Sequence, residues 1–188
     1  MLASIIKQVG PCRLEYRNPG FDTLVRSIVY QQLSGKVASV ILNRLLDAVP
    51  RRKLTPGAVL KLAPEAMRAL GLSNAKVVYI RDLAEKTRAR KVLFKTIDSR
   101  SDEDVIEHLT QVKGIGIWTA HMFLMFALRR PNVLPTGDLG VRAAIRKAYG
   151  LDAMPTPKEV EAIAERWHPH CSVATWYLWR SLDGPAEL

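Results

Sequence analysis

The stretch that decides the fold is Gln111-Val112-Lys113-Gly114-Ile115-Gly116-Ile117-Trp118-Thr119-Ala120. Its two glycines, one residue apart, can adopt backbone angles that are closed to other residues. The helical pattern before them ends near Val112, and a new helix begins near Ile117. The sequence therefore predicts a helix-hairpin-helix, in which a tight glycine turn joins two helices.

The chemistry of this turn favours an anion. Successive N–H groups in a glycine turn form an anion-binding concavity, and the following helix adds the positive end of its dipole. Lys113 adds a full positive charge at the tip. We expect the turn to hold a nucleic-acid phosphate; the alternative is an ordinary helix–helix connection that holds no ligand.

A second turn, Leu134-Pro135-Thr136-Gly137-Asp138, leads into another predicted helix. An aspartate in that position commonly caps the helix by accepting an N–H of its first turn. The positive end of the helix also favours the ionised carboxylate. The same carboxylate can cap the helix and take part in catalysis, and Asp138 is therefore the first candidate for a catalytic group.

The composition indicates a polyanionic partner. The 188 residues include 28 basic and 18 acidic ones, a net charge of +10, which suits RNA, DNA or an anionic membrane surface. No run reaches the roughly 18 apolar residues of a membrane span, and the N-terminal apolar patch is too short for a signal peptide. The two cysteines, Cys12 and Cys171, give no disulfide framework and indicate a reducing compartment.

Helical periodicity dominates the chain, and the alternation typical of strands is nearly absent. The fold class is therefore all-α, with about nine helices. Only the segment 89–100 is ambiguous between a loop and a short strand. The clearest helix signals are the apolar face from Phe21 to Val29, the caps at Thr55-Pro56 and Ser101, the helix from Ser73 to Arg88, the capping box Thr156-Pro157-Lys158-Glu159, and the last helix, from about Cys171 to Leu182.

With the aspartate turn included, the pattern resembles the helix-hairpin-helix DNA glycosylases, and among them the 3-methyladenine DNA glycosylase II branch. The resemblance runs from about Phe21 to Trp179, and its most specific segments are Tyr30-Gln31-Gln32-Leu33-Ser34, residues 114–120 and Asp138. It implies one compact domain over residues 1–188, built of two helical lobes with a DNA-binding cleft between them. One lobe would comprise about 21–130, and the other 1–20 with 131–188.

The resemblance gives Asp138 a role at the sugar. Breaking an N-glycosidic bond builds positive charge on the sugar. A carboxylate about 4 Å away contributes about 4 kcal/mol at an effective dielectric near 20, which is roughly a thousandfold in rate. Bifunctional relatives carry a lysine nucleophile where this chain has Trp118. Because an indole cannot form a Schiff base, we expect a monofunctional hydrolase that leaves an abasic site, with Lys113 as a nearby amine for weak lyase activity.

The resemblance also implies a base pocket. Trp118 and Trp179 would be its walls, since an indole face attracts a cationic methylated purine; the alternative is that these tryptophans belong to the core. Met122 and Leu139 stand at two further pocket positions where the family can carry tyrosine, which leaves the substrate range open.

The expected DNA contacts lie on the hairpin and on a turn earlier in the chain. Leu33 would wedge into the gap left by a flipped nucleotide; alternatively, its spacing from Val25 and Val29 is that of core residues. Lys113 replaces the proline that commonly precedes the first glycine, so the turn would be less rigid but more positive. The complete set of expected DNA-contacting residues is Gln32, Leu33, Lys113, Gly114, Gly116 and Thr119.

No organic cofactor is expected. The resemblance implies a structural Na⁺ or K⁺ held by the backbone carbonyls of Thr110, Val112 and Gly114. Two cysteines exclude the four-cysteine iron–sulfur cluster of endonuclease III-like relatives. The stretch from His168 to Cys171 fits no standard zinc pattern.

The expected function is hydrolysis of the N-glycosidic bond of alkylated purines in DNA, such as 3-methyladenine and 7-methylguanine. Ethenoadenine and hypoxanthine are further substrates to test. The partner would be duplex DNA, with no membrane and no obligate protein partner, and the protein would be a monomer. It would act in the cytoplasm at the nucleoid of a bacterium or archaeon, or in a eukaryotic nucleus. The alternatives are a non-catalytic binder of damaged or bent DNA and a glycosylase for uracil, thymine or oxidised guanine.

Overall fold

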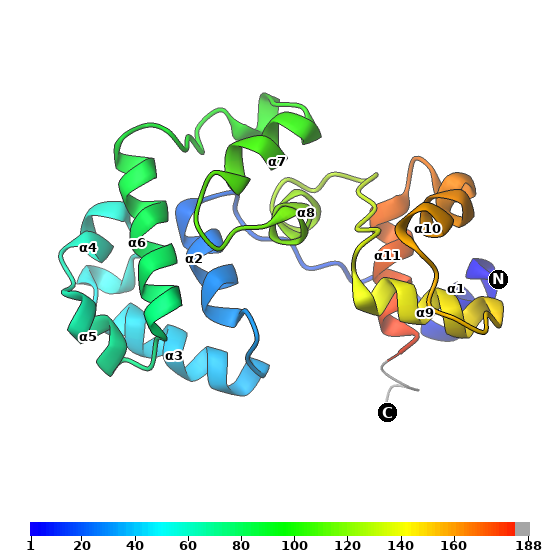
Figure 1. The fold of residues 1–188 in the computed structure, drawn as a ribbon, viewed down its shortest axis with the longest axis horizontal. Helices are drawn as coiled ribbons and strands as arrows, with labels where there is room; N and C mark the ends of the chain where they lie inside the picture. The colour runs from blue at the N-terminus through cyan, green and yellow to red at the C-terminus, as the bar shows by residue number, and fades with distance from the viewer. Residues whose placement is uncertain (183–188) are drawn as a thin grey trace. The chain divides into compact units, whose positions relative to one another are not determined.

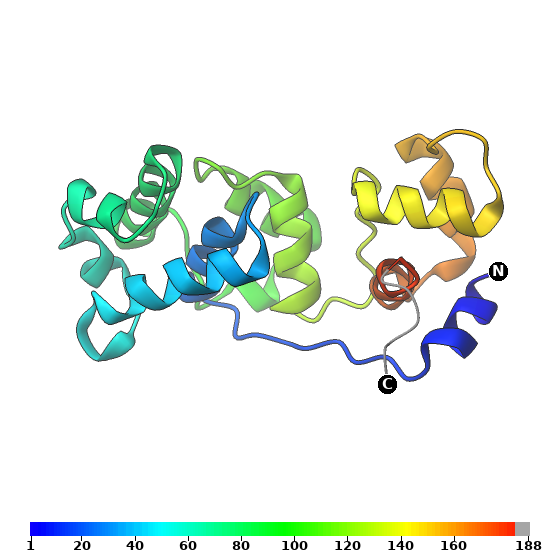
Figure 2. The same cartoon turned by 90° about the horizontal axis from the view of Figure 1, so that it is seen from below.

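A computed structural model describes residues 1–182, and residues 183–188 lie outside the described part. The described residues form eleven α-helices and three short 3-10 helices, and they include no strand (Figures 1 and 2). The all-α prediction is therefore confirmed. The ambiguous segment 89–100 is a loop that includes the 3-10 helix Ile97–Ser99.

The contacts within the chain divide it into two compact units. We call Arg17–Phe123 the hairpin unit, and Met1–Tyr16 with the chain from Leu124 onward the aspartate unit. The sequence predicts these boundaries near residues 20 and 130, whereas the structure places the second one inside a helix, α8 (Ile117–Phe126). That both units form one compact domain stays a prediction.

The hairpin unit is built around α6 (Asn74–Arg88), which contacts α2 (Phe21–Tyr30), α4 (Pro56–Leu60) and α5 (Pro64–Ala69) (Figure 1). The buried face of α2 includes Leu24, Val25 and Ile28, as the periodicity predicts. The other helices of this unit are α3 (Gly35–Asp47), α7 (Asp102–Thr110) and the first part of α8, with 3-10 helices at Pro50–Arg52 and Ile97–Ser99.

Short polar side chains begin most of these helices. The side chains of Ser34, Thr55, Ser73 and Ser101 each accept the backbone N–H three residues later. Each such cap is worth about 1 kcal/mol, because it satisfies a donor that has no partner within the helix. The starts predicted at Thr55 and Ser101 are confirmed, and the helix predicted from Ser73 begins with a cap at Ser73.

A histidine holds the loop that precedes α7. The N–H of Leu93 donates to Nε2 of His108 at 2.8 Å. Burial lowers the pKa of His108, and the positive charge of Arg100 lowers it further. The imidazole is therefore kept in the neutral form that can accept this bond, and the bond gives the Leu93 N–H an acceptor within the loop region.

The aspartate unit packs α11 (Cys171–Arg180) against α1 (Leu2–Val9) and α9 (Leu139–Tyr149) (Figures 1 and 2). Its core includes Val141, Ile145 and Leu178. The capping box predicted at Thr156 and Glu159 is present at the start of α10 (Pro157–Ala164), and the 3-10 helix Glu165–Trp167 follows.

Candidate functional site

The predicted hairpin lies between the end of α7 at Thr110 and the start of α8 at Ile117. Val112 and Ile115 are buried and joined by a bond from the Ile115 N–H to the Val112 carbonyl at 3.1 Å. Lys113 and both glycines are exposed. Two apolar side chains therefore fasten the turn to the protein, and its tip presents backbone and one ammonium group to solvent.

Gly114 meets two separate requirements at this tip. Its φ is +79°, in the region that favours glycine. A Cβ atom at this position would also overlap the ring of Tyr79 on α6. Gly116 differs, because a Cβ there would meet nothing within 4 Å. Gly114 is thus needed for the turn to pack against Tyr79, whereas Gly116 leaves open space at the surface.

A side chain just after the end of α2 and another on α6 hold the hairpin. Nε2 of Gln31 donates to the Gly114 carbonyl at 2.9 Å, and the N–H of Lys113 donates to the carboxylate of Asp82 at 2.9 Å. Sequence reasoning missed both contacts. The partners stand 83 and 31 residues apart, and no local pattern marks such pairs.

The turn between α2 and α3 presents an exposed leucine. Helix α2 ends at Tyr30, and Gln32 adopts a φ of +57°. Leu33 is 38% exposed and stands outside the helix. The alternative that Leu33 continues the core face of Val25 and Val29 is therefore wrong, and Leu33 is available to contact DNA.

A pocket of 510 Å³ lies between this turn and the hairpin. Trp118 is 48% exposed at its edge, whereas Thr119 is buried in its wall. Thr119 is thus placed in the wall rather than at the open surface. The lining residues are Ser27, Tyr30, Gln31, Gln32, Ser73, Ala75, Lys76, Tyr79, Gly114, Trp118 and Thr119.

In the aspartate unit, Asp138 is the N-cap of α9, as predicted. Its Oδ1 accepts the Val141 N–H at 2.7 Å and the indole Nε1–H of Trp179 at 2.9 Å. The indole ring in turn stacks on Phe126, with centroids 6.1 Å apart and planes at 18°. Asp138 is 9% exposed. One carboxylate oxygen is therefore fixed by a helix end and by a tryptophan that is itself held by packing.

Gly140 makes this arrangement possible. A Cβ at position 140 would lie 3.0 Å from Cδ1 of Trp179 and 3.1 Å from Oδ1 of Asp138. These distances are shorter than ordinary van der Waals contact. The glycine therefore lets the last helix approach the start of α9 closely enough for the indole to reach the carboxylate.

The four residues of the expected base pocket come from both units. Trp118 and the half-buried Met122 belong to the hairpin unit, whereas Trp179 and the exposed Leu139 belong to the aspartate unit. Their meeting in one pocket stays a prediction. Trp167 is buried in the core.

Ion-binding groups are sparse among the described residues. No group of three or more His, Cys, Asp or Glu residues in residues 1–182 could hold a metal ion. Of the three carbonyls expected at a monovalent cation, that of Val112 accepts the Ile115 N–H and that of Gly114 accepts the Gln31 amide. Within the same part of the chain, every helix is too short or too polar to cross a membrane.

Comparison with known proteins identifies close relatives. A family model described as "HhH-GPD superfamily base excision DNA repair protein" matches residues 25–170. DNA-3-methyladenine glycosylase 1 of Schizosaccharomyces pombe is 36% identical over 183 residues, which cover 94% of this chain and 80% of that protein.

Two solved structures extend the similarity to the fold. The DNA-3-methyladenine glycosidase of Bacillus halodurans has a TM-score of 0.86 and 36% identity, over 97% of this chain and 84% of that one. The 3-methyladenine DNA glycosylase Mag1 of S. pombe, solved in complex with abasic DNA, has a TM-score of 0.85 and 34% identity, over 96% of this chain and 90% of that one.

Proposed function

Because the chain belongs to the HhH-GPD superfamily of base excision DNA repair proteins, and to its 3-methyladenine DNA glycosylase branch, we propose that it is a monofunctional glycosylase that removes alkylated purines from duplex DNA. The observation that carries the proposal is the Asp138 carboxylate, held at the start of α9 by the Val141 N–H and the Trp179 indole. Its similarity to proteins named as 3-methyladenine glycosylases supports the class of substrate.

The carboxylate suits a reaction that builds positive charge. When the bond between the sugar C1′ and the purine nitrogen breaks, both electrons leave with the purine and the sugar becomes cationic. The two described bonds to Oδ1 of Asp138 come from neutral donors, so they orient the carboxylate without cancelling its charge. A water oxygen then bonds to C1′ and loses one proton to the surrounding water, which leaves a hydroxyl on C1′ and thus an abasic site.

Trp118 limits the chemistry to hydrolysis of the N-glycosidic bond, and together with Trp179 it favours a cationic base. Trp118, near the start of α8, offers an exposed indole face and no amine, so no Schiff base forms there. That indole and the indole of Trp179 attract a base that carries positive charge. 3-Methyladenine and 7-methylguanine are the primary substrates proposed, with ethenoadenine and hypoxanthine as uncharged purines to compare.

Duplex DNA is the partner proposed for the hairpin. The exposed tip carries Lys113 and faces solvent, and the net charge of +10 favours association with a polyanion. The protein acts as a monomer without an organic cofactor, at the nucleoid of a bacterium or archaeon or in a eukaryotic nucleus.

A monovalent cation would strengthen this hairpin. The carbonyls of Thr110, Val112 and Gly114 fit such an ion in donor type, because a carbonyl oxygen has a second lone pair besides the one used in a hydrogen bond. Bound there, Na⁺ or K⁺ would add positive charge beside a DNA phosphate.

The test compares base release with DNA binding in Asp138→Asn. We expect the single-turnover rate on a 7-methylguanine duplex to fall about a thousandfold, while the Kd for a duplex with an abasic-site analogue stays within about threefold. The released base is identified by chromatography. A matched control is Asp47→Asn, which removes an exposed carboxylate paired with Arg52. Equal rates for wild type and Asp138→Asn would favour the non-catalytic binder.

A further inference from the structure

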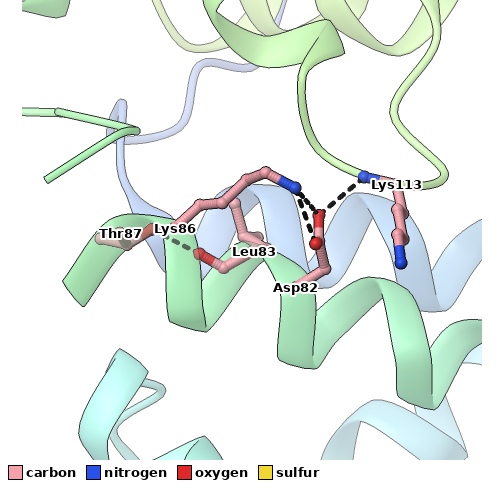
Figure 3. Close-up of polar contacts among 5 residues, drawn as sticks. All are labelled: Asp82, Leu83, Lys86, Thr87 and Lys113. Atoms are coloured by element: carbon pink, nitrogen blue, oxygen red, sulfur yellow. Dashed lines mark hydrogen bonds and ion pairs between the residues drawn. The ribbon is translucent and has the colours of Figure 1, made fainter. Parts of the chain in front are cut away.

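A second carboxylate, Asp82, stands beneath the hairpin on α6. Its side chain is 15% exposed. It accepts the backbone N–H of Lys113 at 2.9 Å and pairs with Nζ of Lys86, one helical turn away, at 2.5 Å (Figure 3). The expected glycosylase reaction uses neither Asp82 nor Lys86, so their arrangement needs another explanation.

The Lys113 amide explains why an acceptor stands there. Lys113 occupies the position before the first glycine of the turn. A proline in that position would need no acceptor and would fix φ, but a lysine has an N–H that must be satisfied. Asp82 draws this one amide inward, onto α6, while Lys113 itself remains exposed. The carboxylate thus supplies the restraint that a proline ring would give.

The negative charge of Asp82 is neutralised by the ammonium of Lys86 beside it. Burial opposes ionisation of the carboxyl, but the bonds from Lys86 and from the Lys113 amide outweigh burial and lower the pKa of Asp82. The group is therefore ionised at neutral pH and paired with an ammonium. Without Lys86, a negative charge so close to the hairpin would repel a phosphate.

The same face of α6 also holds the turn with the candidate wedge. Lys76, Tyr79 and Asp82 follow one another at intervals of three residues, which places them on one side of the helix. Nζ of Lys76 donates to the carbonyls of Val29 and Gln31, at 2.7 Å each. The ring of Tyr79 lies directly against Gly114. One helix face thus contacts both elements expected to touch DNA.

We propose that Asp82 is a positioning residue for DNA binding, which holds the tip of the hairpin on α6 in fixed register with the turn that carries Leu33. Its action passes through the Lys113 amide and requires no contact with DNA. The inference rests on the proposed function only in taking duplex DNA as the ligand.

The experiment is a double-mutant cycle with Asp82→Ala and two substitutions of Lys113. Lys113→Ala removes the ammonium and keeps the N–H, whereas Lys113→Pro removes both. In the wild-type and Lys113→Ala backgrounds, Asp82→Ala should raise the Kd for an abasic-analogue duplex about tenfold, the effect of one hydrogen bond to a charged group. In the Lys113→Pro background it should raise the Kd less than twofold, because no amide remains to be held.

Further measurements separate positioning from charge and from stability. Asp82→Asn keeps an acceptor and should bind within about twofold of wild type, whereas a pure charge effect would make both Asp82 variants bind more tightly. At saturating DNA the single-turnover rate of Asp82→Ala should match wild type. Glu65→Ala, which removes an exposed carboxylate paired with Arg68 on α5, is the control for general charge loss.

Three outcomes would overturn the inference: an unchanged Kd in Asp82→Ala, an equal loss in the Lys113→Ala and Lys113→Pro backgrounds, or a loss in Asp82→Asn as large as in Asp82→Ala. Wild-type protein that binds the duplex and releases no base would overturn the proposed function and leave this inference standing. Wild-type protein that does not bind DNA would overturn both.

Discussion

Asp82 in the hairpin unit and Asp138 in the aspartate unit are bound in similar ways by different donors. Both carboxylates accept a backbone N–H, from Lys113 at 2.9 Å for Asp82 and from Val141 at 2.7 Å for Asp138. Both also accept a hydrogen bond from a side-chain donor. For Asp82 this donor is the ammonium of Lys86, and for Asp138 it is the indole of Trp179.

The chemistry of the side-chain donor separates the two roles. An ammonium neutralises the carboxylate that it binds, which suits a group that fastens one segment to another. An indole N–H fixes direction but contributes no net charge. Under the two proposals, the same type of residue would serve as an anchor in one unit and would stabilise a cationic sugar in the other.

The largest difference should appear when the same substitution is made at both positions. Asp138→Asn should lower the rate of base release about a thousandfold, since it removes the negative charge that would stabilise the cationic sugar. Asp82→Asn should leave that rate within about twofold, because the amide oxygen still accepts the Lys113 N–H. Single-turnover assays at saturating DNA measure both. Similar losses at the two positions would remove the distinction between anchor and catalyst.

Removal of the indole donor tests how much orientation contributes. Trp179→Phe keeps a ring that can stack on Phe126 and deletes the bond to Oδ1 of Asp138. We expect the rate to fall about tenfold, the typical effect of one hydrogen bond to a charged group. Trp176→Phe is the matched control, since Trp176 packs edge-on against Tyr177. A loss in the control as large as in Trp179→Phe would mean that packing of α11, and not the bond, is what matters.

A smaller loss is expected from a methyl group placed beside Asp138. Gly140→Ala introduces a Cβ within 3.1 Å of both Oδ1 and the indole, so one of them must move by a few tenths of an ångström. We expect a rate about threefold lower with an unchanged or slightly higher Tm, because alanine favours helices. Gly57→Ala in α4, where a Cβ meets nothing within 4 Å, should leave the rate unchanged. If Gly140→Ala retains the full rate, the close approach is not needed for catalysis.

The smallest effect concerns pH. The pKa of Asp82 is lowered from 3.8 in the folded protein, so its ionised form is favoured by folding. Its contribution to stability is fully present above the unfolded value and is lost as the pH falls through the folded pKa. The Tm of Asp82→Asn should therefore lie below that of wild type at pH 6, and the gap should narrow below about pH 4. A gap that widens in acid would contradict the lowered pKa.

Local signals predicted much of the fold. The glycine turn, the capping box at Thr156 and the cap at Asp138 were readable because each is decided by residues within one helical turn. The all-α class followed from the periodicity. Helix α1 carried too weak a pattern to be recognised: Ile5 is its one buried residue, and it is held in place by packing against α11.

Contacts between segments far apart in the chain could not be predicted from the sequence. Nothing around Asp82 marks it as the acceptor for an amide 31 residues later, and the indole that reaches Asp138 stands 41 residues beyond it. The exposure of Leu33 was also hidden, because its spacing continues that of α2 although the helix ends at Tyr30. Such features depend on where the chain turns, and a turn of non-glycine residues, such as Gln32 at a positive φ, has little sequence signature.

The missing side chain at position 140 has a consequence for engineering. Screens for thermostability often favour glycine-to-alanine changes within helices, which can yield up to about 1 kcal/mol. At the second residue of α9 the same change would crowd Asp138 and Trp179. A variant selected there for a higher Tm would have a lower rate of base release. The Cβ atom of an alanine at position 140 would thus raise thermostability and lower activity at the same time.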